Sequence, residues 1–348
     1  MASPASELAR TAPVPPPFDI VRAAFVELRV TDLDASEAFY AGLLGMIVSA
    51  RTDDAVYLRG WEERQHHSLI LRQSPPAQPA AAARLGFRVR TEDDLDLAAA
   101  HFAQQGLTAR WIEAGSDPGL GRALRVWDPF GYPLEFFGTI EQVATQHQRF
   151  DLHRGAPLLR FDHVNLHAPQ VEDAFRFWLS LGFRCSEYIS TDDAATERMT
   201  GAWLLRKPTV HDVALTAGTG PRLHHFAYWV TDPAGVMRAC DQLAGGYRTD
   251  VIERGPGRHG VSNAFFVYLR DPDGHRIELY SCDYYTGDPD HQPLRWSVND
   301  PRCRSFYGTR APDSWYEESS LLLGPDGEPV PIASANVDER AQRSEVAA

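Results

Sequence analysis

Short runs of apolar or alternating residues, separated by Gly, Pro and Asp, recur along most of the chain and predict β-strands. The clearest of these runs are residues 23–30, 160–167, 223–230, 264–269 and 276–280. Four further stretches have the spacing of amphipathic helices, at residues 32–44, 95–105, 171–181 and 233–243. No run reaches the roughly 18 apolar residues that a membrane helix needs, so no membrane partner is expected.

Two segments far apart in the chain share one pattern, which indicates an internal repeat. Residues 127–138 read WDPFGYPLEFFG, and residues 270–281 read RDPDGHRIELYS. A strand followed by a helix opens each half, and further strands and a second helix come after them. The chain is therefore expected to consist of two related halves.

The two ends differ in composition from the rest of the chain. Residues 1–17 are polar and rich in proline and lack the apolar core of a signal peptide, so a disordered lead is expected. Residues 326–348 show no apolar periodicity and are expected to form a mobile tail. The net charge of -13 argues against a nucleic-acid partner, and four cysteines without CxxC spacing indicate a reduced, cytoplasmic protein.

The stretch of residues 254–280 concentrates side chains that can carry chemistry. The sequence Asp-Pro-Asp-Gly at residues 271–274 predicts a turn between two strands. Alternation on the second strand places Arg276, Glu278 and Tyr280 on one face. A buried carboxylate needs a cation or a hydrogen-bonding partner, whereas an edge-strand glutamate faces water. The hairpin alone leaves both interpretations of Glu278 open.

Two upstream strands add histidines to this set. On the first, alternation places Phe161, His163 and Asn165 on one face. On the second, His224 and His225 are adjacent, so only one of them can face a shared interior. A lone histidine in a strand is more often structural than a ligand. Two neutral imidazoles with one carboxylate, however, form the facial triad of non-haem iron(II) oxygenases.

A long motif in the second half resembles the signature of the extradiol ring-cleavage dioxygenases, which belong to the vicinal oxygen chelate superfamily. Its elements are Gly257-x-His259, Val267-Tyr268, Asp271-Pro272-x-Gly274 and Glu278. The resemblance extends over residues 20–325 and includes DYYTGDPD at residues 283–290. It implies a homotetramer that takes a small-molecule catechol as substrate and dioxygen as co-substrate.

The resemblance also implies an α+β fold with two tandem domains, each of paired βαβββ modules that form an open barrel. The N-terminal domain, without a metal site, is expected to cover residues 18–145, and the catalytic domain residues 155–285. A closing segment at residues 286–325 would form a C-terminal lid over the pocket.

The family pattern assigns roles to individual residues. His163, His225 and Glu278 match the ligands of an Fe(II) or Mn(II) ion. His211 matches an acid-base histidine, and the ordinary pKa of histidine suits proton transfer near neutral pH. The hydrogen-bonding groups beside the metal match His259 and Tyr268. The substrate-binding positions match Asn165, Trp203, Tyr280 and two arginines that would hold a carboxylate on the substrate's side chain, Arg254 and Arg304.

Aligned on the repeat, the first half lacks this ligand set. Phe25 takes the place of the first histidine ligand, a position near Gly86 that of the second, and Glu135 that of the carboxylate. One carboxylate cannot hold a divalent metal against water unaided, so Glu135 is interpreted as a surface or paired charge. The adjacent His66 and His67 have no second strand to complete a metal site.

Three functions stay open from the sequence. The first is ring cleavage of a catechol with a carboxylate side chain, and the second is cleavage of another catechol, such as catechol itself or 2,3-dihydroxybiphenyl. The third is metal-free binding of a small molecule by the same fold, because a fold does not fix a function.

Overall fold

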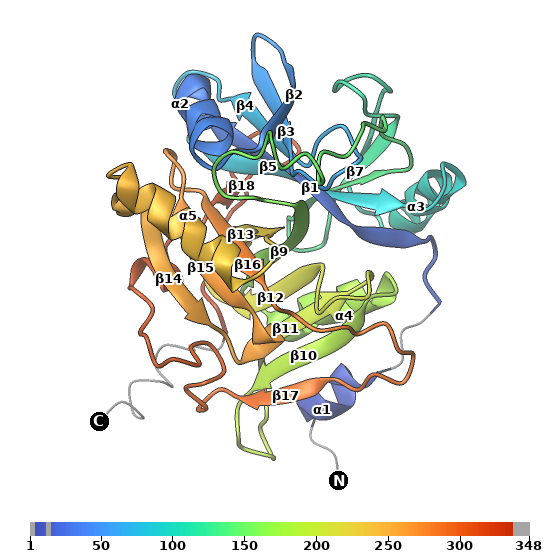
Figure 1. Ribbon diagram of the computed structural model, residues 1–348. Helices are drawn as coiled ribbons and strands as arrows, with labels where there is room; N and C mark the ends of the chain where they lie inside the picture. The colour runs from blue at the N-terminus through green and yellow to red at the C-terminus, as the bar shows by residue number, and fades with distance from the viewer. Residues whose placement is uncertain (1–3, 12–14, 337–348) are drawn as a thin grey trace.

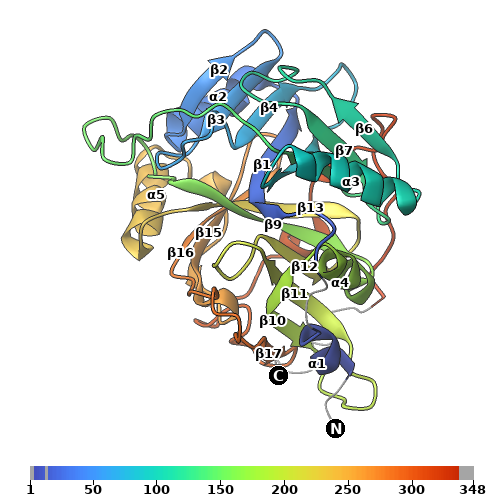
Figure 2. The ribbon, with the colours of Figure 1, turned by 90° about the vertical axis from the view of Figure 1, so that its right-hand side faces the viewer.

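The computed structural model describes residues 4–11 and 15–336, and its strands form two large sheets (Figure 1). The first sheet has the order β2-β3-β4-β1-β5-β8-β7-β6, and the second has the order β14-β15-β16-β13-β9-β12-β11-β10-β17. The blue and teal half lies above the green and orange half in Figure 1. The halves meet where β1 crosses β9 (Figure 2).

Each half repeats the order strand, helix and three strands twice. The elements of the first half are β1 (Ile20–Val30), α2 (Leu33–Glu37), η1 (Ala38–Leu43), β2 (Ile47–Arg51), β3 (Ala55–Arg59), β4 (Leu69–Gln73), β5 (Ala81–Val89), α3 (Asp93–Gln104), β6 (Ala109–Ile112), β7 (Ala123–Trp127) and β8 (Pro133–Phe137). Asp32 caps α2 by accepting a hydrogen bond from the Ala35 amide.

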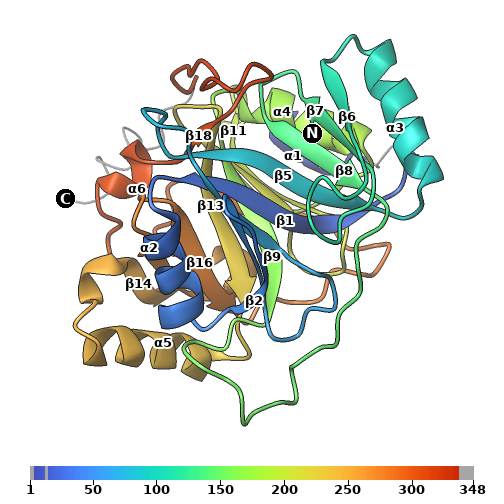
Figure 3. The ribbon, with the colours of Figure 1, turned by 90° about the horizontal axis from the view of Figure 1, so that it is seen from above.

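The second half follows the same plan. Its elements are β9 (Arg160–Ala168), α4 (Val171–Ser180), β10 (Arg184–Ser190), β11 (Met199–Leu205), β12 (Val213–Ala217), β13 (Arg222–Trp229), α5 (Pro233–Gly245), η2 (Thr249–Val251), β14 (Ile252–Arg258), η3 (Val261–Asn263), β15 (Phe265–Arg270) and β16 (Arg276–Ser281). The α+β fold with paired βαβββ modules is thus confirmed. Helices α2 and α5 lie on one side of the molecule, and α3 and α4 lie on the other (Figure 3).

The segment after β16 touches both sheets. Its elements are β17 (Leu294–Ser297), α6 (Ser314–Glu317) and β18 (Leu321–Leu322). Strand β17 pairs with β10 in the second sheet, and β18 pairs with β5 in the first. The C-terminal segment therefore connects the two halves, and it also contributes residues to the lining of the pocket described below.

The two ends contain more structure than their composition suggests. Helix α1 (Pro4–Ala9) buries Ala5 and Ala9 and packs against β10, so the expected disorder does not hold for this part of residues 1–17. The methyl groups of these two alanines are enough for this packing. The polar average composition of residues 1–17 does not reveal it. Near the other end, Ala333 forms a β-bridge with Gly220. The remainder of the expected tail, residues 337–348, lies outside the described residues.

Candidate metal centre

Two β-bulges place the histidines of the second half. In the pairing of β9 with β13, Asp162 and His224 are extra residues with no partner on the facing strand. A bulge redirects the side chains around it. Phe161 consequently packs against Tyr228 in the core, with ring centroids 5.7 Å apart, and not on the face of His163 as strict alternation predicts. Each bulged residue directly precedes a histidine that faces the pocket.

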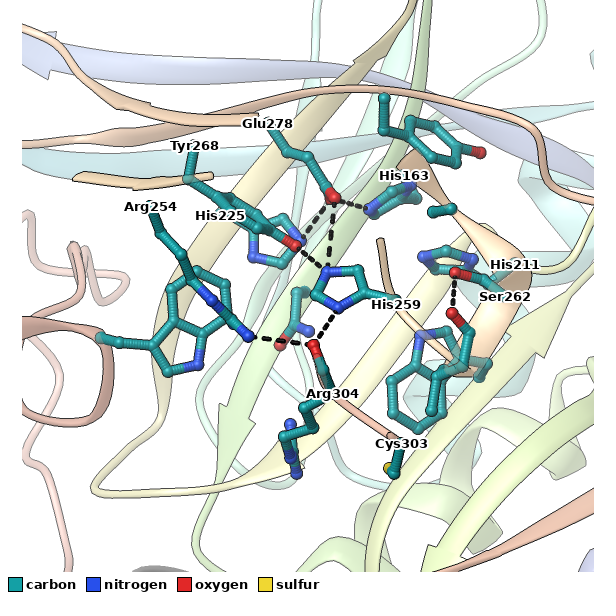
Figure 4. Close-up of a pocket in the computed structure, with 16 residues that line it drawn as sticks. His163, His211, His225, Arg254, His259, Ser262, Tyr268, Glu278, Cys303 and Arg304 are labelled. Carbon is teal, nitrogen blue, oxygen red and sulfur yellow. Dashed lines mark hydrogen bonds and ion pairs between the residues drawn. The ribbon is translucent and has the colours of Figure 1, made fainter. Parts of the chain in front are cut away.

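Three side chains from β9, β13 and β16 converge inside the second barrel. The Nε2 atoms of His163 and His225 lie 3.1 Å and 3.2 Å from Oε2 of Glu278 (Figure 4). One ligand atom from each residue falls within 4.8 Å of the others, and all three residues are buried. Ligand atoms about 2.1 Å from one divalent ion and at right angles to each other lie ~3.0 Å apart. The spacing therefore fits a shared metal ion.

The hydrogen bond behind His163 supports the same conclusion. Nδ1 of His163 donates to the carboxylate Oδ2 of Asp162 at 3.0 Å, which leaves Nε2 as an acceptor. Nε2 nevertheless faces the carboxylate of Glu278, which is also an acceptor. Two acceptors that face each other at this distance need a cation or a proton between them. Two imidazoles and one carboxylate suit Fe(II) or Mn(II), so the residues present fit the predicted ion.

The electrostatics of the site follow from burial and from this pairing. Burial raises the pKa of Glu278, but its two imidazole partners outweigh burial and hold the pKa well below its ordinary range. Burial lowers the pKa of His225 to about 4. Burial also lowers the pKa of His163, but Asp162 and Glu278 raise it above its ordinary value. The carboxylate is thus ionised and ready to bind a cation.

A second hydrogen-bonded group borders the triad. Nδ1 of His259 lies 2.5 Å from the carbonyl oxygen of Arg304 and donates to it, so Nε2 accepts from the Tyr268 hydroxyl at 2.9 Å (Figure 4). Burial and the nearby Arg254 lower the pKa of His259 to about 3. Burial and Glu278 raise the pKa of Tyr268 well above its ordinary value. The pair is therefore a neutral imidazole and a protonated phenol.

His211 packs face to face with the first ligand. Its ring centroid lies 3.8 Å from that of His163. Burial holds the pKa of His211 well below its ordinary value, and the neighbouring His163 lowers it further. Among the described residues, no group forms a hydrogen bond with Nδ1 of His211. The ring is thus neutral and has an atom free for proton exchange.

These groups line one pocket in the second half of the chain. Every site residue selected from the sequence lies in its lining. The structure adds Val261, Ser262, Ala264, Cys303 and Trp315. Trp315 was missed because α6 follows an irregular stretch in which several aromatic residues have no periodic spacing.

Arg254 is buried in the pocket wall. Its guanidinium stacks over Trp315, 4.3 Å from the ring centroid, and lies 5.2 Å from the centroid of Phe266. Nη2 donates to the carbonyl oxygen of Arg304 at 2.9 Å. A cation held this way on an apolar wall is well placed for an anionic group of a ligand.

Tyr280 lines the pocket and also contacts a carboxylate beside the first metal ligand. Its hydroxyl donates to Oδ2 of Asp162 at 2.6 Å, behind His163. Burial raises the pKa of Asp162, but Lys207 and the hydrogen bond from His163 lower it far below its ordinary range. The hydroxyl of Tyr280 therefore stabilises the buried carboxylate of Asp162 by a hydrogen bond. The bulge at Asp162 creates this arrangement, which alternation alone does not indicate.

The register of β1 and β5 corrects one prediction about the first half. In the second half, His225 lies across from the residue two positions after His163. In the first half, Arg84 lies across from Glu27, two positions after Phe25. Arg84 therefore stands in the place of the second histidine ligand, and the predicted equivalent is two residues away.

Arg84 is fully buried and forms ion pairs with Glu27, Asp117 and Glu135. Its Nη1 lies 2.5 Å from Oε1 of Glu135, so Glu135 is a paired charge. Burial lowers the pKa of Arg84, but the carboxylates raise it well above its ordinary value. Burial raises the pKa of Asp117, but Arg84 lowers it to about 2. A guanidinium thus pairs with Glu135 in the first half, where the second half has His225 beside Glu278.

The first half also retains the placement of the third histidine. His67 lies two residues before the β4 residue that pairs with Val26, just as His211 lies two residues before the β12 residue that pairs with Val164. Burial and the neighbouring His66 lower the pKa of His67 to about 3. The duplicated halves therefore share this position although Phe25 offers no ligand atom.

Comparison with known proteins agrees with the fold and the site. A profile of the Glyoxalase/Bleomycin resistance protein/Dioxygenase superfamily matches residues 22–136 and 160–279. The manganese-dependent 2,3-dihydroxybiphenyl 1,2-dioxygenase of Geobacillus genomosp. 3 is 31% identical over 81% of this chain and 91% of its own. The metapyrocatechase of Geobacillus stearothermophilus is 31% identical over 86% of this chain and 94% of its own.

A solved structure is more similar still. Homoprotocatechuate 2,3-dioxygenase from Brevibacterium fuscum, in an anaerobic complex with 3,4-dihydroxyphenylacetate, is 44% identical and has a TM-score of 0.88. The match covers 92% of this chain and 99% of that one. The chain belongs to the Glyoxalase/Bleomycin resistance protein/Dioxygenase superfamily and, within it, to the extradiol dioxygenases. In the part of the chain that the structure describes, no helix is long and apolar enough to cross a membrane.

Proposed function

We propose that the protein cleaves 3,4-dihydroxyphenylacetate with dioxygen, next to the catechol hydroxyls, to give 5-carboxymethyl-2-hydroxymuconate semialdehyde. The observation that carries this proposal is one pocket that combines the His163, His225 and Glu278 triad with the buried guanidinium of Arg254. The triad supports the ring cleavage, and the arginine supports an acidic side chain on the catechol. The likeness to a dioxygenase solved with 3,4-dihydroxyphenylacetate supports the same substrate.

The three ligands would hold Fe(II) or Mn(II). When bound, such an ion supplies a centre on which a catechol and dioxygen can meet, because three protein ligands leave coordination positions open. The manganese-dependent relative supports Mn(II) as one of these two ions. The charge of Glu278, with two neutral imidazoles, leaves a residual positive charge that favours an anionic catechol.

His259 and Tyr268 would receive the substrate's hydroxyl groups. His259 is neutral, because its pKa lies far below neutral pH, and its Nε2 can accept a hydrogen bond from a catechol hydroxyl. Tyr268 stays protonated and can donate a hydrogen bond to a substrate oxygen. The contact between His259 and the carbonyl of Arg304 keeps the imidazole in one tautomer and orientation.

His211 would carry the later proton transfers. Its ring stands beside His163, and Nδ1 has no hydrogen-bond partner among the described residues. A neutral imidazole in this place can accept a proton and return it during oxygen insertion. Asn165 and Trp203 would complete the walls around the catechol ring.

Arg254 and Arg304 would bind the carboxylate of the substrate. Arg254 is buried between Trp315 and Phe266, so a charge-assisted hydrogen bond to it is shielded from water. Arg304 belongs to the closing segment and lines the same pocket. An apolar catechol leaves these cations without an anionic partner from the substrate.

Reconstitution with each ion tests the function. The protein is stripped of metal, loaded anaerobically with Fe(II) or Mn(II), and given 3,4-dihydroxyphenylacetate with air. The expected result is a ring-opened semialdehyde that contains both oxygen atoms of dioxygen, measured by visible absorbance and by mass. No turnover with either ion would refute the enzyme. Equal efficiency with 4-methylcatechol or 2,3-dihydroxybiphenyl would refute the proposed substrate and favour another catechol dioxygenase.

The homotetramer and the cytoplasmic location belong to the same proposal. Light scattering on the metal-loaded protein is expected to give four times the chain mass of 38.8 kDa. A monomeric mass would contradict the tetramer and leave the proposed reaction untouched.

A further inference from the structure

The chain contains a single lysine. Lysine and arginine together number 34, and Lys207 is the one residue among them that is not arginine. An arginine presents its donors in a flat fork, whereas a lysine ammonium presents three donors from one compact point. A sequence that otherwise uses arginine throughout retains the compact cation at one position, four residues before His211.

The contacts of Lys207 explain this choice. Its Nζ donates to the carbonyl oxygen of Asp162 at 2.7 Å, to the carbonyl oxygen of His211 at 2.5 Å and to Oδ1 of Asp212 at 3.2 Å. Three acceptors thus surround one nitrogen. One ammonium group joins the residue before the first metal ligand to the backbone of the proposed acid-base histidine.

The preceding residue shows the contrasting use of arginine. The guanidinium of Arg206 donates to the carbonyl oxygens of Ile20 and Gly182, at 2.6 Å and 2.5 Å, and to Asp19 at 2.7 Å. Asp19 and Ile20 are neighbours in the first half, and Gly182 belongs to the second half. Arg206 therefore connects the two halves. Lys207 connects the backbone of Asp162 with that of His211 behind the metal ligands.

Asp162 links Lys207 to the metal ligand His163. Its side chain is fully buried, and its Oδ2 accepts from Nδ1 of His163 at 3.0 Å and from the Tyr280 hydroxyl at 2.6 Å. Nζ of Lys207 lies 3.6 Å from the same oxygen. A carboxylate that accepts a hydrogen bond from Nδ1 of a ligand histidine fixes the tautomer and the orientation of the ring and makes Nε2 more basic.

We propose that Lys207 and Asp162 are positioning residues of the metal centre. Asp162 directs Nε2 of His163 at the metal, and Lys207 fixes the backbone of Asp162 and of His211 at a set spacing. This proposal rests on the metal site of the proposed function but on no property of the substrate. Neither residue touches the ion or the catechol.

Metal affinity measured without substrate or oxygen tests the proposal. Mn(II) is titrated into metal-stripped full-length protein, and the free ion is followed by its electron paramagnetic resonance signal. Asp162→Ala and Lys207→Met are each expected to weaken Mn(II) binding roughly 10- to 100-fold, the effect typical of groups that orient metal ligands. Lys207→Arg is expected to weaken it too, because a planar fork cannot reach three acceptors around one point. Asp162→Asn, which keeps an acceptor, should recover part of the loss.

Arg160→Gln is the matched control. Arg160 lines the same cavity between the halves as Lys207, but it pairs with Glu62 and stacks on Trp229. Its loss removes one positive charge from the cavity and is expected to leave the Mn(II) affinity unchanged. Unchanged affinity in folded Asp162→Ala and Lys207→Met would overturn the proposal.

A measurement on the unaltered protein decides the question if the variants do not fold. Labelling with ¹⁵N-lysine gives one ammonium signal, because the chain has one lysine. Three hydrogen bonds at the back of the site should slow proton exchange with water enough for this signal to be seen. A rapidly exchanging ammonium would overturn the proposal. The proposed function fails separately, when the metal-loaded protein binds Mn(II) normally but cleaves no catechol.

Discussion

Nδ1 of His259 lies 2.5 Å from the carbonyl oxygen of Arg304, which ties a histidine of the pocket to the backbone of the closing segment. The same carbonyl accepts a hydrogen bond from Arg254. The proton on Nδ1 obliges Nε2 to act as an acceptor toward Tyr268. A shift of the closing segment therefore changes the orientation of a proposed hydrogen-bond acceptor that lies beside the metal ligands.

Replacing any one ligand is expected to remove the metal. His163→Ala, His225→Ala and Glu278→Ala each leave two ligand atoms, too few to hold the ion against water and chelators. Elemental analysis of folded protein after passage over a chelating resin measures the loss, and turnover is expected to disappear with the metal. His67→Ala changes a buried histidine in the first half and should retain full metal content. Full occupancy in a folded His225→Ala variant would contradict the assignment.

His211→Phe is expected to separate binding from chemistry. The variant should hold metal and bind the catechol anaerobically, because His211 is neither a metal ligand nor one of the proposed substrate-binding residues. Turnover should fall by roughly 10²- to 10⁴-fold, the contribution typical of a general acid or base. Anaerobic titration and steady-state rates measure the two effects. Loss of catechol binding in a metal-loaded variant would instead make His211 an anchoring residue.

Arg254→Met is expected to change the choice of substrate. A charge-assisted contact contributes about 1.5 to 3 kcal/mol, so kcat/KM for 3,4-dihydroxyphenylacetate should fall roughly 10- to 150-fold. The value for 4-methylcatechol and the metal content should stay near those of the unaltered protein. Arg304→Met is expected to act in the same direction.

Arg302→Gln provides the control for the two arginine variants. Arg302 lies in the same segment but is exposed and pairs with Asp300. Its replacement should leave both substrates unaffected. A similar drop for both catechols in the Arg254 variant would show that Arg254 supports the fold of the pocket and not the carboxylate.

The lowered pKa of Glu253 predicts that the free energy of unfolding decreases in acid. Burial raises its pKa, but Arg276 and Arg270 outweigh burial and lower it from 4.5 to about 2. The unfolded chain therefore takes up this proton first as the pH falls. The stabilisation is complete above about pH 4.5, is lost as the pH falls toward 2, and amounts to roughly 2 to 3 kcal/mol.

Unfolding measured by denaturant between pH 6 and pH 3 tests this prediction. The pH dependence of the unaltered protein should be steeper than that of Glu253→Gln. Glu318→Gln is the control, because Glu318 is exposed and pairs with Arg270 from the surface. Equal slopes for the unaltered protein and Glu253→Gln would contradict the assigned pKa.

Arg84→Met is expected to destabilise the first half. The change leaves Glu27, Asp117 and Glu135 buried around a missing cation, and breaking a buried ion pair costs about 3 to 5 kcal/mol. Adding Glu135→Gln should recover part of this loss. Arg122→Met, at a partly exposed arginine that pairs with Asp96, should cost no more than about 1 kcal/mol. Denaturant unfolding compares the variants, and an unchanged midpoint for Arg84→Met would contradict the role.

Sequence patterns predicted much of the architecture. The repeat of residues 127–138 at 270–281 indicated two halves, and alternation placed Glu278 on one face of a strand with Arg276 and Tyr280. Both signals come from local or periodic spacing in the sequence, so they can be recognised without knowing which strands pair. Ring-cleavage chemistry came from a motif whose residues lie within one hairpin and the loop before it.

The missing information concerns register and long-range contacts. A bulge adds one residue without any mark in composition, so alternation misplaced Phe161 and gave no role to Asp162. The same difficulty hid Arg84, whose partner on the facing strand depends on bulges in β1 and β5. Lys207 carried a visible signal, its rarity, but the acceptors that explain it come from separate strands.

The arginine inside the first half bears on how the polypeptide matures in a cell. Its positive charge arrives with the chain during translation, so the first half can close around its carboxylates before any ion is captured. The ligands of the second half leave the ribosome later, and domains generally fold in the order of synthesis. Iron or manganese shortage is therefore expected to leave the first half with its charges paired and the second half without the cation that its ligands need.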